Sequence, residues 1–115
     1  VVCAVGVPCG NALVTLAKNL GVAPTPVSQE QSVADVLGKV TSGEADAGVV
    51  YATDAKAAGA KVATVPIQGS DKVVNRYPIA ATASAKDPAL AAAFVAYVTG
   101  AKGGAVLATY GFGTP

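Results

Sequence analysis

The chain has 115 residues and a net charge of +1, which corresponds to one ordinary domain without the basic surface that nucleic acids or anionic membranes require. Histidine is absent, so the sequence excludes a Ser-His-Asp triad, a Cys-His pair and most zinc sites. Apolar residues make up 52% of the chain, but 25 are Ala and 19 are Val, so we expect a core of small side chains.

The first two-thirds of the chain is predicted to alternate between short strands and helices. The strands are apolar runs rich in Val, and the helices carry apolar residues every three or four positions. In chain order these are a strand at Val1–Ala4, a helix at Asn11–Leu20 ended by Gly21, an extended piece up to Ser28, a helix from the N-cap Ser32 to Ser42, a central strand at Ala47–Tyr51, a short helix at Thr53–Ala58 and a strand at Lys61–Ile67. This alternation predicts an α/β fold with a mainly parallel sheet flanked by helices.

The last third of the chain is predicted to lack this alternation and to consist of an extended segment followed by two helices. Asn75–Ser84 is an extended segment whose Pro78 favours an edge or crossover strand over a central one. Asp87 caps a helix that breaks at Gly100, and Ala101–Tyr110 forms a last short helix. We therefore divide the chain into an α/β lobe at 1–74, a return crossover strand at 75–84 and C-terminal helices at 85–115.

Three places could bind a ligand, because ligands of parallel α/β sheets bind beyond the carboxyl ends of the strands. They are the loop Val7–Gly10, the helix entry at Gln31–Val33, and Tyr51 at the end of a strand. The first two offer backbone N–H groups with a helix dipole behind them, which suits an anion. Every helix has such an end, however. By this geometry alone, Val33 is a core residue through its side chain, although its amide could be functional at the same time, and Tyr51 is favoured as a strand-end aromatic whose hydroxyl reaches water.

Longer motifs carry a family resemblance. The stretch from Ser42 to Ala55, Ser-Gly-Glu-Ala-Asp-Ala-Gly-Val-Val-Tyr-Ala-Thr-Asp-Ala, resembles the G-x-A-D-A-G-(I/V)-V-Y-x-(S/T)-D-A segment of the molybdate-binding proteins of ABC transporters. In the same order, Val7–Gly10, Arg76–Ala80 and Tyr110–Gly113 are similar to that family's V-P-x-G loop, Y-P-(I/V) return strand and Y-G-F ending. The resemblance spans essentially the whole chain. It implies a type II periplasmic-binding fold, in which two α/β lobes hold molybdate or tungstate between them.

The resemblance also implies which atoms hold the oxyanion. Carried over, they are the backbone amides of Cys9 and Val33 and the hydroxyl of Tyr51. Cys9 replaces the commoner Ala or Gly, but an amide donor does not depend on its side chain. A tetrahedral dianion offers only acceptors, so a site made of donors suits it.

The same resemblance implies that this chain is the second lobe with the C-terminal helices only. Two Ser-containing loops of the family's first lobe have no counterpart here. The C-terminal helices would pack on that missing N-terminal lobe or on a second copy of the chain. Without such a partner their apolar faces would lie partly uncovered, at Leu90, Phe94, Val98, Val106 and Leu107.

The implied function is extracytoplasmic capture of the oxyanion for an ABC permease, with no catalysis, no cofactor, no metal ion and no nucleic acid. A lipoprotein form of the full-length protein is compatible with this function. Three alternatives stay open: the effector domain of a transcription regulator with the same fold, a binding protein for sulfate or phosphate, and a small thiol oxidoreductase.

Cys3 and Cys9, the two cysteines of the chain, bear on these alternatives. Their C-x5-C spacing differs from the C-x-x-C of redox enzymes, and without His they make a poor metal site. Because the implied protein is exported, we predict that Cys3 and Cys9 form a structural disulfide, whereas a cytosolic regulator would keep two reduced thiols.

Overall fold

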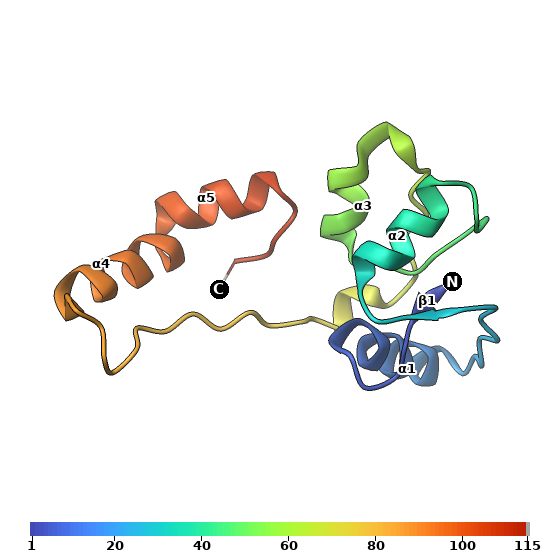
Figure 1. Cartoon of the computed structure of the whole chain (residues 1–115), viewed down its shortest axis with the longest axis horizontal. Coiled ribbons are helices and arrows are strands. Elements are labelled where there is room, and N and C mark those ends of the chain that lie inside the picture. Colours follow the sequence, from blue (N-terminus) through green and yellow to red (C-terminus); the bar gives the residue numbers. More distant parts are fainter. Residues whose placement is uncertain (115) are drawn as a thin grey trace. The chain divides into compact units, whose positions relative to one another are not determined.

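The computed structural model describes residues 1–114, and the chain divides into two units, Val1–Asn75 and the part from Arg76 onward (Figure 1). In the first unit, strands β1 (Val2–Cys3) and β2 (Gln29–Glu30) pair in parallel. The ladder continues beyond the short strands, because the Ala4 N–H donates to the carbonyl of Glu30 at 2.7 Å.

A third segment lies on the other side of β1. The Val1 amine donates to the Ala47 carbonyl at 2.7 Å, and the Val1 carbonyl accepts from the Val49 N–H at 3.2 Å. These two hydrogen bonds join Val1 to the residues on either side of Gly48, which is the pattern of a parallel ladder. β1 is therefore the central element, with Ala47–Val49 on one side and β2 on the other.

Two predicted strands are wrong. Ala47–Tyr51 is not a regular strand, because its pairing stops at Val49 and no second backbone among residues 1–114 pairs with its other side. Lys61–Ile67 is not a strand either. Gly59–Lys61 forms a turn of 3-10 helix, and the residues from Ala63 to Ile67 are exposed, with Val65 at 82%. An apolar run becomes a strand only when another backbone pairs along it. Within the described residues Ala47–Val49 pairs only with Val1, and Lys61–Ile67 pairs with no neighbouring strand.

The helices of this unit are α1 (Pro8–Leu20), α2 (Val33–Thr41) and α3 (Ala52–Ala58). α1 begins three residues earlier than predicted, because Pro8 occupies the first helical position, where its missing N–H costs nothing. It ends as predicted at Gly21, whose φ of 66° is left-handed. The predicted N-cap of α2 is confirmed, since the Ser32 hydroxyl oxygen accepts from the Asp35 N–H at 3.2 Å.

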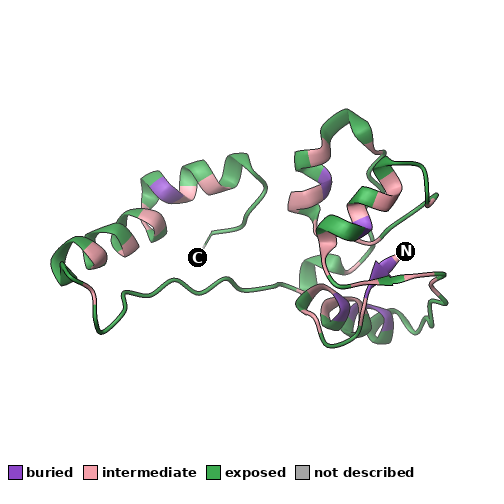
Figure 2. Ribbon diagram, viewed as in Figure 1, coloured by how far each residue is buried: buried purple, intermediate pink, exposed green. Residues whose placement is uncertain are grey.

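The helices cover both sides of the paired strands. α1 packs against β1, and α2 packs against both strands from the opposite side and also contacts α3 (Figure 1). The chain is therefore of the α/β class. The buried apolar residues lie between these layers and are small, as predicted, with Val36 fully buried (Figure 2): Val2, Cys3, Leu16, Ala17, Val36 and Ala55.

Two glycines permit this close packing. A Cβ on Gly48 would lie 2.7 Å from Cγ1 of Val36, so α2 could not approach the third segment as it does. A Cβ on Gly10 would lie 1.8 Å from the Ala4 carbonyl oxygen. Gly10 therefore lets the first turn of α1 contact the loop that leaves β1.

The second unit contains α4 (Pro88–Thr99) and α5 (Ala101–Thr109), which pack on each other. Asp87 caps α4 as predicted, through a bond from the Leu90 N–H to its carboxylate at 2.9 Å. The rings of Tyr77 and Phe112 meet edge to face, with centroids 6.0 Å apart.

Much apolar surface of α4 and α5 is uncovered. Leu90, Phe94 and Val106 are 54–66% exposed, as predicted, whereas Val98 and Leu107 are half-buried. Residues 75–84 pair with no strand in the part of the chain that is described, and the division at 74 and 84 stays a prediction. Among the described residues no single helix is long and apolar enough to cross a membrane; α4 and α5 reach that length and hydropathy only as a pair, bent by 52°.

Candidate functional site

The three predicted site residues lie at the starts of three helices. Cys9 is the second residue of α1, Val33 is the first residue of α2, and Tyr51 is the N-cap of α3. Each helix directly follows one of three neighbouring parallel segments. Because the carboxyl ends of parallel segments meet at one edge of a sheet, all three helix starts belong to the same edge.

The order of the segments adds a second topological feature. From β1 the chain moves to one side to form β2, and it then crosses back to place Ala47–Val49 on the other side of β1. α1 and α2 accordingly cover opposite sides of the strands (Figure 1). This reversal is a switch point, where open α/β sheets bind ligands. The switch point lies between β1, which leads to Cys9, and Ala47–Val49, which leads to Tyr51.

The start of α1 is held by a disulfide. Cys3, at the end of β1, is bonded to Cys9 in the first helical turn, and their Cα atoms are 5.7 Å apart. The predicted disulfide is therefore confirmed. The first ladder bond of α1 is donated by the Asn11 N–H to the Val7 carbonyl at 3.0 Å. The Cys9 N–H precedes that bond and has no partner within the helix, as at any helix start.

The start of α2 uses a side-chain cap. The Ser32 hydroxyl accepts from the Asp35 N–H and also donates to the Asp35 carboxylate at 2.7 Å. This cap satisfies the third N–H of the helix and leaves the Val33 N–H outside the ladder. The Val33 side chain is half-buried, so its packing role and an amide role are compatible.

The hydroxyl of Tyr51 has a partner that the sequence analysis missed. The Asn75 side-chain Nδ2 donates to it at 3.1 Å, and the Tyr51 side chain is half-buried. The Tyr51 carbonyl accepts from the N–H groups of Asp54 and Ala55, both at 3.1 Å. Asn75 lies 24 residues further along the chain, so no local pattern could have identified this contact.

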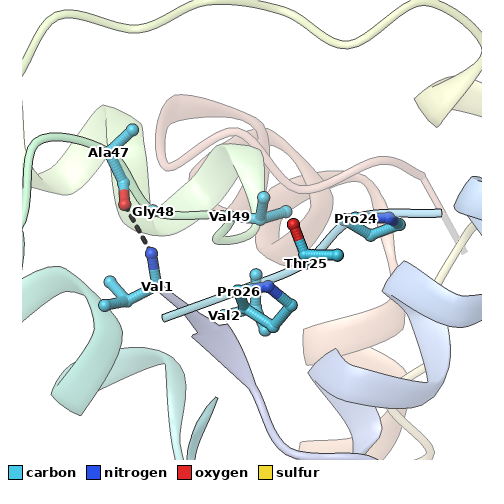
Figure 3. A pocket seen from close by; sticks show the side chains of 8 residues that line it. All are labelled: Val1, Val2, Pro24, Thr25, Pro26, Ala47, Gly48 and Val49. Carbon is cyan, nitrogen blue, oxygen red and sulfur yellow. Dashed lines mark hydrogen bonds between the residues drawn. The ribbon is translucent and has the colours of Figure 1, made fainter. Parts of the chain in front are cut away.

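Among the described residues of this unit, pockets are found at two places that bear on the site, and none of the three predicted residues lines either pocket. The first, of about 210 Å³, lies at the amino ends of the parallel segments, away from the predicted edge (Figure 3); it is lined by Val1, Val2, Pro24, Thr25, Pro26, Ala47, Gly48 and Val49. The second, of about 520 Å³, runs between α1 and the segment 72–75; it is lined by Pro8, Asn11, Ala12, Thr15, Lys72, Val73, Val74 and Asn75. Asn75 therefore borders a pocket beside the start of α1 while it also contacts Tyr51.

One ion pair among the described residues joins β2 to α2. The Lys39 ammonium lies 2.6 Å from the Glu30 carboxylate and 3.0 Å from the Ser28 hydroxyl. The bond from Lys39, aided by that from Ser28, holds the pKa of Glu30 below its usual value, and the bond to Glu30 raises the pKa of Lys39. Both groups stay charged near neutral pH and offset each other, so the pair carries no net charge.

Comparisons with known proteins identify the family of the chain. Residues 4–113 match the family of bacterial extracellular solute-binding proteins, and the chain belongs to that family. Membership implies an extracytoplasmic location, and the family is one of binding proteins rather than enzymes. No solved structure matches the chain.

The curated relatives carry a more specific name. The chain is 46% identical over its whole length to proteins named molybdate-binding protein ModA from Mycobacterium tuberculosis and Mycobacterium bovis. The match covers 44% of the length of each relative, so the chain spans less than half of them. The predicted resemblance to molybdate-binding proteins is therefore confirmed.

Proposed function

We propose that the chain is one lobe of a type II periplasmic binding protein that captures molybdate or tungstate for uptake by an ABC permease. The amides of Cys9 and Val33 and the hydroxyl of Tyr51 are the donors of this lobe. The observation that carries the proposal is that these three residues begin three helices at one edge of a parallel sheet. The identity to relatives named for molybdate binding supports the same ligand.

The physical chemistry of these donors suits an oxyanion without any cationic side chain. Each helix start carries a partial positive charge and N–H groups that the helix does not use. A fully ionised tetrahedral anion offers only acceptor oxygens, so amide and hydroxyl donors match all of them. The function needs no cofactor and no resident metal ion, because capture requires only these donors.

Sulfate and phosphate use the same donor chemistry, so their discrimination depends on the size and protonation of the anion. The regulator alternative is disfavoured by two observations. The disulfide between Cys3 and Cys9 suits an oxidising compartment, and the matched family is extracellular. Whether the protein is anchored as a lipoprotein is a separate matter from capture of the anion.

In this proposal the second half of the site comes from another lobe. The chain spans 44% of its relatives, and donors on one side alone leave the anion open to water, where each contact is weak. We therefore expect the isolated chain to bind molybdate very weakly at most. The exposed apolar faces of α4 and α5 are where such a lobe, or a second copy, would pack.

The proposal is tested by calorimetric titration of the complete two-lobed protein with molybdate, tungstate, sulfate and phosphate. Replacing Tyr51 by Phe removes one hydrogen bond to a charged ligand and should cost about 1.5–3 kcal/mol, or roughly ten- to a hundred-fold in Kd. Tyr97→Phe makes the same chemical change on the exposed surface of α4 and should leave Kd unchanged. An unaltered Kd for Tyr51→Phe would remove Tyr51 from the site, and absence of molybdate binding would refute the ligand.

A further inference from the structure

The contact between Asn75 and Tyr51 has a chemical consequence for the proposed site. We propose that Asn75 is a positioning residue that holds the Tyr51 hydroxyl as a hydrogen-bond donor toward the ligand, and that it thereby makes the site discriminate against oxyanions that carry a proton. This inference rests on the proposed function, since it assigns a role to a residue that the ligand itself need not touch.

The direction of the hydrogen bond carries the first step. A tyrosine hydroxyl has one proton to donate and lone pairs to accept, whereas the Nδ2 of an asparagine side chain can only donate. Nδ2 of Asn75 lies 3.1 Å from the Tyr51 oxygen, so the hydroxyl is the acceptor in this contact. Its single proton must therefore point away from Asn75, whatever other groups the hydroxyl contacts.

The position of Asn75 carries the second step. The chain reaches it through a 3-10 turn at Ser70–Lys72, which is closed by the Val73 N–H donating to the Ser70 carbonyl at 3.0 Å. Asn75 then lines the same pocket as Pro8, the residue before Cys9. The asparagine thus links the start of α3 to the surroundings of the start of α1, which are the two helix starts that flank the switch point.

The chemistry of the ligand carries the third step. Molybdate, tungstate and sulfate are unprotonated at neutral pH and need donors only, whereas phosphate keeps at least one P–OH group and needs an acceptor for it. Because Asn75 occupies the acceptor side of the Tyr51 hydroxyl, a P–OH group on the other side meets the hydroxyl proton instead of a lone pair. The protonated anion then has an unsatisfied donor, which should weaken its binding by roughly tenfold or more. Without Asn75, the hydroxyl can turn and serve as donor or acceptor.

The first experiment needs no ligand and uses Asn75→Leu, which keeps the size of the side chain and removes its hydrogen bond. The readout is the intensity ratio of the tyrosine Fermi doublet in the Raman spectrum, which is high when the phenolic oxygen accepts a hydrogen bond and low when the hydroxyl donates. The Tyr51 contribution is isolated by subtracting the spectrum of Tyr51→Phe. We expect Asn75→Leu to lower this ratio. A rise would mean that the hydroxyl donates to Asn75, and no change would mean that the contact is absent; either result overturns the inference.

The second experiment measures Kd for molybdate and for phosphate in the complete protein. Asn75→Leu should reduce the preference for molybdate over phosphate about tenfold, and in the Tyr51→Phe background it should have no further effect on that preference. Asn19→Leu, the same substitution at an exposed position of α1, should leave the preference unchanged.

The outcomes separate the two proposals. If Tyr51→Phe weakens molybdate binding while Asn75→Leu leaves the preference intact, the proposed function stands and the inference is overturned. An equal loss from Asn75→Leu with and without the Tyr51 hydroxyl would show that Asn75 acts only on the fold, and it would overturn the inference as well. If Tyr51→Phe has no effect on binding, the assignment of Tyr51 to the site fails together with the role of Asn75.

Discussion

Replacing Gly10 by Ala should destabilise the first unit strongly, because the added methyl group meets backbone rather than a movable side chain. The new Cβ would lie 1.8 Å from the Ala4 carbonyl oxygen and 2.5 Å from the Ala4 carbonyl carbon. Ordinary contact begins at 3.4 Å, so the first turn of α1 would have to retreat by about 1.6 Å. The disulfide from Cys3 to Cys9 opposes that movement, since it ties the same turn to β1.

The expected cost lies near the top of the range for an overpacked site, about 3 kcal/mol. Urea unfolding followed by circular dichroism measures it as a fall in the free energy of unfolding. Gly38→Ala is the matched control, because it lies inside α2 with no atom within 4 Å of the new Cβ. That variant should gain about 0.5–1 kcal/mol from helix propensity. A Gly10→Ala protein as stable as the parent would refute the packing of α1 against the loop after β1.

Two further predictions concern the cross-links of the first unit. The double variant Cys3→Ser, Cys9→Ser should lose about 2.4 kcal/mol of unfolding free energy on the chain-entropy estimate for a loop of seven residues, measured by urea unfolding; equal stability of parent and variant would contradict it. The pKa of Glu30 is lower in the folded chain than its usual 4.5, so its ion pair with Lys39 stabilises above about pH 4.5 and that contribution is lost as the pH falls through the lowered pKa. Glu30→Gln should therefore show a flatter loss of stability on acidification than the parent, and an identical pH profile would exclude this role.

The sequence-based predictions are accurate where the interacting residues are close together in the sequence. Ser32 and Asp87 were predicted as helix caps from residues within three positions of each, and both make the predicted bonds. The C-terminal end of α1 at Gly21 is equally local, since it depends on one left-handed residue. Such features can be predicted because the interacting groups are fixed by a few consecutive residues.

Two of the predicted strands failed because strand formation depends on distant residues. Ala47–Tyr51 and Lys61–Ile67 have the apolar composition of strands, but a strand requires a second backbone to pair with, and that backbone comes from elsewhere in the chain. Ala47–Val49 found one neighbour in Val1, and Lys61–Ile67 found none among the described residues. The apolar composition of a segment favours its burial, but only backbone hydrogen bonds to a second segment make it a strand.

For the candidate site, too, some features could be predicted from the sequence and others required the tertiary structure. The sequence by itself determined the family resemblance and the absence of histidine chemistry, because these follow from residue types and their spacing. The three residues proposed as donors are implied by that resemblance. Only the tertiary structure decided that Cys9, Val33 and Tyr51 begin helices at one edge of a parallel sheet, and that Asn75 donates to Tyr51. The reason is that a contact across 24 residues depends on the path of the whole backbone between them, which no local pattern encodes.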